Sequence, residues 1–129
     1  MKKELTITQT QQLLYGVLRI SFCGDITNVL FSEGEVPPFN IDDLLETLPA
    51  EAQLKVNFDG EEHTVMSKLN IQRFNSNNKV WYDTCEPAKD GTHPLASPVF
   101  EAEELIDALF EMIMWTVDNY PEKINPDVI

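Results

Sequence analysis

Residues 54–71 read LKVNFDGEEHTVMSKLNI, and this stretch decides the fold. Its first half places apolar side chains at every second position, namely Leu54, Val56 and Phe58. That period of two is typical of a half-buried strand. Asp59-Gly60 follows at once, and this dipeptide favours a two-residue hairpin turn. The returning segment carries apolar residues on one strand face, at Val65, Leu69 and Ile71, with Ser67 between them. We therefore expect an antiparallel hairpin with one apolar face.

A third strand follows this hairpin. Residues 75–78, Asn-Ser-Asn-Asn, predict a second turn, and residues 79–85 then resume an extended pattern. Residues 86–94 predict a loop because they contain two prolines and an Asp90-Gly91 pair. The middle of the chain therefore predicts an antiparallel meander of about three to four strands.

The clearest helix lies near the C-terminus. Ser97 suits its N-cap, Pro98 its first helical position, and Pro121 its end. Apolar residues between them form one broad stripe, namely Ala102, Leu105, Ile106, Leu109, Ile113, Val117 and Tyr120. A stripe of this kind packs on a sheet. Because the helix is apolar on many sides, we also expect either a second packing layer or self-association.

An N-terminal helical region precedes the meander. Thr8, with Gln11 three residues on, matches the capping box of a first helix. Apolar residues at helical spacing follow, namely Leu14, Leu18, Phe22, Ile26, Val29 and Leu30. Gly16 and Gly24 weaken a helix over residues 8–32, and residues 15–22 also fit a strand. Both alternatives stay open at this point.

A short helix completes the predicted elements. Asn40 is typical of the N-cap of a helix that runs through Thr47 and is ended by Pro49. Helices before and after an antiparallel meander are typical of an α+β fold, with the helices gathered on one face of the sheet. The length suits a single domain over residues 1–129, and we expect its tail, residues 121–129, to fray.

The chain is strongly acidic, with 22 Asp and Glu against 9 Lys and Arg and a formal charge of −13. Its hydrophobic fraction of 43% is enough for a core, which argues against global disorder. Phosphate backbones and anionic membranes attract basic patches, so direct binding to nucleic acid or to a membrane is disfavoured. Cys23 and Cys85 have no metal-ligand spacing, which is typical of free thiols in a reducing cytosol, and we expect a cytoplasmic protein.

The acidity is concentrated in two blocks. Residues 33–62 hold nine acidic side chains and one basic one, and residues 90–129 hold the same numbers. In the second block, acidic residues fall within one sector of roughly 100° on the expected helix, namely Glu103, Glu104, Asp107, Glu111 and Asp118. Met114 lies inside this sector, Trp115 lies just beyond its edge, and the helix holds no lysine or arginine.

Two interpretations of this sector stay open. It is either a solvated face or an acidic surface that binds a basic partner, with Met114 and Trp115 as the apolar anchor. Core packing or a dimer contact explains the two apolar residues equally well. Asp42, Asp43 and Glu46 open the short helix, where the helix dipole favours acids. They are alternatively a second lobe of the same partner surface.

No catalytic, cofactor or metal motif stands out. His63 and His93 lack a second histidine at metal-ligand spacing, and Cys85 with His93 is the one candidate thiolate–imidazole pair. Two sets of carboxylates offer oxygen ligands for a hard cation without matching an EF-hand loop, namely Asp42 with Glu46, and Asp83 with Glu86 and Asp90. We therefore expect neither an enzyme activity nor a cofactor.

Three function classes fit these features. In size and acidity the chain resembles the immunity proteins of bacterial toxin–immunity systems, and this resemblance implies an inhibitor that blocks a basic, toxin- or nuclease-like protein partner. The alternative is an acidic secretion-type chaperone or adaptor that binds an extended peptide as a homodimer through the C-terminal helix. The third class is an enzyme without a recognisable motif.

Overall fold

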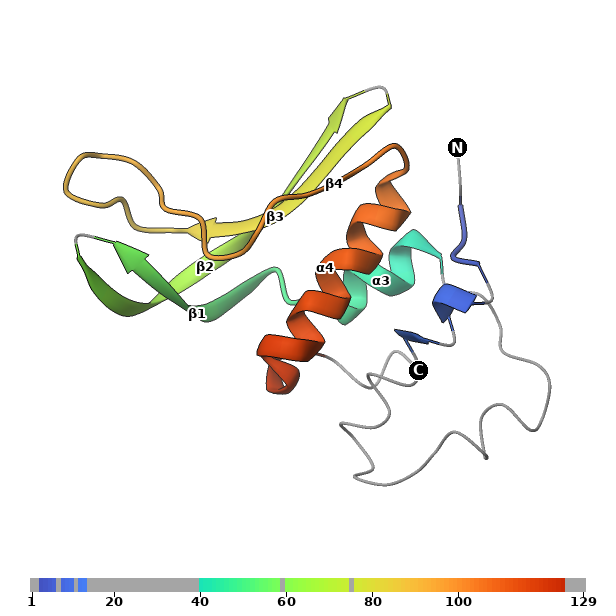
Figure 1. The fold of residues 1–129 in the computed structure, drawn as a ribbon, viewed down its shortest axis with the longest axis horizontal. Helices are drawn as coiled ribbons and strands as arrows, with labels where there is room; N and C mark the ends of the chain where they lie inside the picture. The colour runs from blue at the N-terminus through green and yellow to red at the C-terminus, as the bar shows by residue number, and fades with distance from the viewer. Residues whose placement is uncertain are drawn as a thin grey trace.

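The computed structural model describes residues 3–6, 8–10, 12–13, 40–58, 60–74 and 76–124. Its sheet is antiparallel and has four strands, and helices α3 and α4 lie together on one side of it (Figure 1). This arrangement confirms the expected α+β class. The choice between helix and strand over residues 14–32 lies outside the described residues.

The sheet is a meander. β1 spans Glu51–Phe58, β2 Glu61–Phe74, β3 Asn77–Thr84 and β4 Phe100–Ala102, in the spatial order β1-β2-β3-β4. Phe58 pairs with Glu61, so two residues connect β1 to β2. Gly60 has a φ of +81°, which glycine adopts without strain. Leu54 pairs with Val65, and the hairpin predicted for residues 54–71 is confirmed together with its shared apolar face.

The second turn is shorter than the sequence predicts. Phe74 pairs directly with Asn77, so only residues 75 and 76 connect β2 to β3. Asn78 belongs to the strand and is only 6% exposed, and its Nδ2 donates a hydrogen bond to the Glu103 carbonyl at 2.8 Å. The prediction of a four-residue turn over residues 75–78 is therefore wrong, and β3 begins two residues earlier than expected.

α4 spans Leu105–Asn119, so the prediction that it starts at Pro98 is wrong. The Ser97 hydroxyl is not a helix cap, because it accepts a hydrogen bond from the Tyr82 amide of β3 at 2.8 Å. Phe100 then pairs with Val80, and the chain forms β4 before the helix begins. The Ser-Pro signal of a capped helix is thus overridden by pairing with a strand that is distant in the sequence.

The other helix ends agree with the sequence in part. α3 spans Ile41–Thr47 with Asn40 as its N-cap, as predicted, and it ends before Pro49. Of the tail predicted to fray over residues 121–129, the structure describes residues 121–124, and residues 125–129 lie outside the described residues. Pro121–Lys123 forms the 3-10 helix η1, and Ile124 is buried in the core.

The N-terminal cap lies two residues earlier than predicted. Thr6 Oγ1 accepts a hydrogen bond from the Gln9 amide at 3.1 Å, and Gln9 Oε1 accepts one from the Thr6 amide at 3.0 Å. This reciprocal pair is the capping box that the sequence analysis assigned to Thr8 and Gln11. The assignment is wrong because residues 6–9 and 8–11 both match the pattern Thr-x-x-Gln.

The core lies between the helices and the sheet. α4 packs on β3 and β4 with one buried face, formed by Leu105, Ile106, Ala108, Leu109, Met112, Ile113 and Thr116. α3 packs on α4 through the same core, and Leu5, Leu13 and Ile124 complete it. Of the two outcomes expected for so apolar a helix, the structure therefore contains the second packing layer.

The other side of the sheet carries neither α3 nor α4, and we call it the open sheet face. Side chains alternate between the two sides of each strand, so the strand registers show on which face of the sheet each side chain lies. The open sheet face consists of Glu51, Gln53, Lys55, Asn57, Glu62, Thr64, Met66, Lys68, Asn70, Gln72, Phe74, Asn77, Lys79, Trp81, Asp83 and Glu101. It lies opposite the buried row Ala52, Leu54 and Val56.

Candidate functional site

α4 presents an acidic row on the side away from the core. Four residues fall within roughly 60° of one another at 100° per residue, namely Asp107, Glu111, Met114 and Asp118, and we call them the acidic face of α4. Glu111 and Asp118 are exposed, whereas Asp107 and Met114 are half-buried. This part of the predicted sector is therefore on the surface of the molecule.

The carboxylates of this face differ in their surroundings. Asp107 Oδ1 accepts a hydrogen bond from Gln9 Nε2 at 3.0 Å, which ties the N-terminal residues to the helix. Glu111 and Asp118 make no hydrogen bond or ion pair with the described residues. Since α4 contains no lysine or arginine, no cation on the helix itself neutralises them. Within the part of the chain that the structure describes, both charges are therefore without a neutralising partner.

The two apolar residues near the acidic face have different environments. Met114 lies in the row between Glu111 and Asp118 and packs partly against the core. Trp115 packs against Tyr120 in a tilted arrangement, with ring centroids 5.6 Å apart and planes inclined by 51°. The Tyr120 hydroxyl accepts a hydrogen bond from the Lys55 amide of β1 at 3.0 Å. Trp115 therefore helps to hold the end of α4 against the sheet edge, and Met114 is the apolar member of the acidic face.

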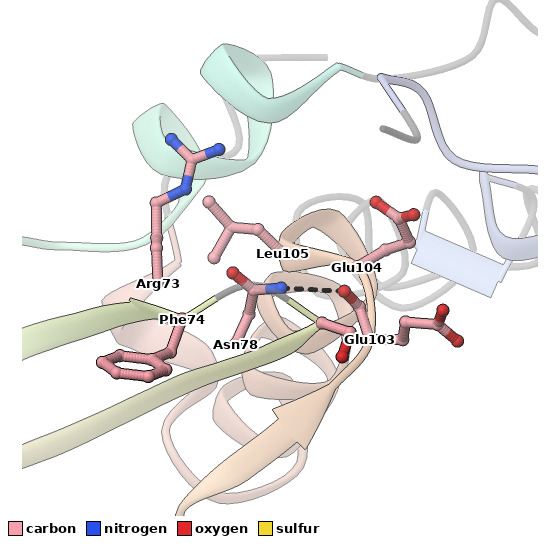
Figure 2. Close-up of a pocket in the computed structure, with 7 residues that line it drawn as sticks. Arg73, Phe74, Asn78, Glu103, Glu104 and Leu105 are labelled. Carbon is pink, nitrogen blue, oxygen red and sulfur yellow. Dashed lines mark hydrogen bonds between the residues drawn. The ribbon is translucent and has the colours of Figure 1, made fainter.

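Glu103 and Glu104 do not belong to the acidic face, because both precede the first turn of α4. They line a hollow of about 410 Å³ between the start of α4 and the β2–β3 hairpin, together with Arg73, Phe74, Ser76, Asn78 and Leu105. Figure 2 shows Arg73 and Phe74 on one side of this hollow and both glutamates on the other. The sequence contains no signal for this juxtaposition, because it depends on how far β2 extends past α4.

The three acids of α3 are divided by the fold. Asp43 closes a capping box, since its Oδ2 accepts a hydrogen bond from the Asn40 amide at 3.0 Å. That interaction gives Asp43 a structural role at the helix start. Asp42 and Glu46 are exposed on the surface.

Of the candidate catalytic and metal-binding groups, His93 is engaged by the backbone. His93 Nδ1 lies 2.9 Å from the Thr84 carbonyl and donates its proton to that oxygen. Cys85 is half-buried and free. No three His, Cys, Asp or Glu side chains in the described part of the chain gather closely enough to hold a metal ion. Nor does any helix in that part have the length and apolar character needed to cross a membrane.

A tryptophan that the sequence analysis did not single out lies on the open sheet face. Trp81 is half-buried, yet it is not among the side chains packed on the core. The signal was available in β3, where Val80 and Tyr82 flank Trp81 and alternate with it.

No protein-family model matches the chain, and no curated protein or solved structure is significantly similar to it.

Proposed function

We propose that this chain is an acidic binding protein of the immunity or antitoxin type, which inhibits a basic toxin or nucleic-acid-binding enzyme by covering its basic surface. The acidic face of α4 carries this proposal. Glu111 and Asp118 are exposed carboxylates without a partner in the described structure, and Met114 lies between them. An apolar side chain among unneutralised charges suits a partner that is itself basic around an apolar contact.

The physical basis is electrostatic attraction followed by close packing. Enzymes that bind nucleic acids carry basic clefts for phosphate groups, and carboxylates on a rigid helix can occupy the positions of those phosphates. A net charge of −13 attracts such a cleft from a distance and speeds association. The final affinity then depends on buried apolar contacts, for which Met114 is the available residue.

The fold keeps the acidic face in place before a partner arrives. The opposite side of α4 is fully buried, as Ile106, Leu109 and Met112 show. Because the helix backbone cannot move without disrupting this packing, little backbone entropy is lost when the partner binds. The acidic row also costs stability, since like charges at positions i and i+4 destabilise a helix by about 0.2–0.5 kcal/mol. Asp107 and Glu111 have this spacing.

The test is a charge reversal with a matched control. Glu111→Lys with Asp118→Lys raises the net charge from −13 to −9. Glu86→Lys with Glu122→Lys makes the same change at two exposed acids outside α4. Association with the purified product of the adjacent gene is followed by stopped flow, and growth is followed while that product and this chain are expressed together.

We expect the wild-type chain and the control to restore growth, and the α4 variant to fail. Its association rate should fall by about 10-fold or more at low salt, and the difference should shrink as salt screens the charges. Equal rates for the two double variants would exclude the acidic face of α4 as the interface. An adjacent product that neither binds this chain nor arrests growth would overturn the inhibitor function itself.

A further inference from the structure

The open sheet face carries apolar side chains that the core does not use. Met66 is 38% exposed on β2, and the half-buried Trp81 lies on β3 opposite Asn70, four residues along β2 from Met66. Leu95 is 53% exposed and pairs with Asp83, which places it on the same side of the sheet. Val99, 40% exposed, alternates with the core-facing Phe100 and extends the patch. None of these four side chains packs on the core.

This face is close to neutral, although the chain as a whole is strongly acidic. It holds four acids, Glu51, Glu62, Asp83 and Glu101, and three lysines, Lys55, Lys68 and Lys79. Its net charge is therefore −1, within a chain of −13. In the strand registers, positive side chains lie beside negative ones. Lys68 pairs with Glu51 on one side and with Asp83 on the other, and Lys79 pairs with Glu101.

We propose that two copies of the chain associate through their open sheet faces, with Trp81 near the centre of the interface. A symmetric dimer brings one patch against an identical patch, so a strongly acidic patch repels its own copy. A dimer through the acidic face of α4 is disfavoured by this repulsion, because Glu111 and Asp118 of the two copies would lie near each other. The open sheet face avoids it, since its lysines can face the carboxylates of the second copy.

The proposal moves the dimer contact away from the C-terminal helix, where the sequence placed it. Two sheets pack face to face at about 10 Å, with side chains of both interleaved. Trp81, Leu95 and Val99 supply the apolar centre of such a contact, and the charged residues supply its rim. Because α4 lies on the other side of the sheet, the dimer leaves both acidic faces exposed.

The first test is the mass of the protein in solution, measured by sedimentation at concentrations from about 1 to 100 µM. We expect the mass to rise towards twice 14.7 kDa. Trp81→Lys should keep the monomer mass throughout this range. The control is Leu45→Lys, which makes the same change of an apolar residue to lysine on α3, on the other side of the sheet. It should dimerise as the wild type does, and circular dichroism checks that both variants are folded.

The second test uses charge and does not depend on the fold of the Trp81 variant. Lys68→Glu with Lys79→Glu makes the open sheet face strongly acidic, so the dimer should dissociate at low salt and form again at high salt. Trp115→Phe leaves Trp81 as the sole tryptophan, and its emission should shift to shorter wavelength as concentration rises. A wild-type mass that stays monomeric, or a Trp81→Lys variant that dimerises normally, overturns the proposal. No partner protein is used, so the outcome is independent of the inhibitor function.

Discussion

The acidic face of α4 and the open sheet face lie on opposite sides of the sheet and differ in charge and apolar content. On α4, Glu111 and Asp118 have no cation on their own helix. On the sheet, Lys68 lies between Glu51 and Asp83 in the registers of the neighbouring strands. The first surface suits a partner of opposite charge, and the second suits a copy of itself.

The difference follows from the geometry of the two elements. Like charges one helical turn apart cost only a few tenths of a kcal/mol, about 0.2–0.5, so a helix tolerates an acidic row. Cross-strand neighbours have Cβ atoms about 5 Å apart, and like charges directly opposite are destabilising, which favours alternating signs on a sheet. A chain of −13 can therefore concentrate its unneutralised charge on a helix more easily than on a sheet face.

The largest expected effect comes from the core that joins the two surfaces. Leu109 is fully buried on α4, and Leu109→Ala should lower the free energy of unfolding by about 2–5 kcal/mol because it removes apolar contacts and leaves a cavity. Trp81 reports on the open sheet face, and Trp115 reports on the end of α4. Denaturation of Leu109→Ala is followed by tryptophan fluorescence in two backgrounds. Trp115→Phe leaves the signal of Trp81, and Trp81→Phe leaves the signal of Trp115. We expect one transition with the same midpoint for both probes.

Two separate midpoints would contradict this picture, because they would show that the helical side and the sheet side unfold independently. The exposed Leu45→Ala is the matched control on α3. It should change the free energy of unfolding far less, since most of what it removes is already in contact with water.

The two surfaces were not equally predictable from the sequence. The α4 row could be read from helical spacing, and so Asp107, Glu111 and Asp118 were identified correctly as one surface. Glu103 and Glu104 were assigned to the same row only because the start of the helix was misplaced. The Ser97-Pro98 pair is a good local signal for a helix start, but the Tyr82 amide binds the Ser97 hydroxyl in the fold.

The sheet was predictable where its signals are local. The hairpin at Gly60 and the cap at Asn40 depend on residues next to one another, and both were confirmed. β4 was not predicted because three residues paired with β3 leave no periodicity of their own. The open sheet face was missed for a related reason. Its composition emerges only when side chains from four strands are placed in register.

A smaller effect is expected where the end of α4 meets the sheet edge. The Tyr120 hydroxyl accepts the Lys55 amide hydrogen in the middle of β1, which is an edge strand. Tyr120→Phe removes this bond but keeps the ring that packs against Trp115, so it should cost about 0.5–1.5 kcal/mol. Amide hydrogen exchange at Lys55 should become faster, and the freed edge should become more open to pairing with an added strand.

The control for Tyr120→Phe is Tyr82→Phe. It removes the Tyr82 hydroxyl, which donates a hydrogen bond to the Pro49 carbonyl at 2.6 Å, and keeps the buried ring. Tyr82→Phe should also destabilise the fold but should leave Lys55 exchange unchanged in conditions where exchange needs only local opening. If both variants accelerate amide hydrogen exchange at Lys55 equally, the Tyr120 hydroxyl does not protect the β1 edge. That result would favour the alternative function, in which a chaperone or adaptor binds an extended peptide along the β1 edge.

The smallest expected effect concerns the loop that carries Leu95 to the open sheet face. Asp90 Oδ1 accepts hydrogen bonds from the Thr92 hydroxyl at 2.6 Å and from the Thr92 amide at 3.0 Å, and these bonds lower the pKa of Asp90 below its ordinary value of 3.8. A lowered pKa in the folded state means that the carboxylate stabilises the loop above about pH 4 and that this contribution is lost as pH falls through the lowered pKa. Titration of the Asp90 carboxyl carbon by NMR should therefore show a midpoint below 3.8, and Thr92→Val, which keeps only the amide donor, should move that midpoint upward. A midpoint that is the same in both proteins would mean that the Thr92 hydroxyl does not stabilise the Asp90 carboxylate. Any loss of stability of this loop at low pH would then come from the protonation of other groups.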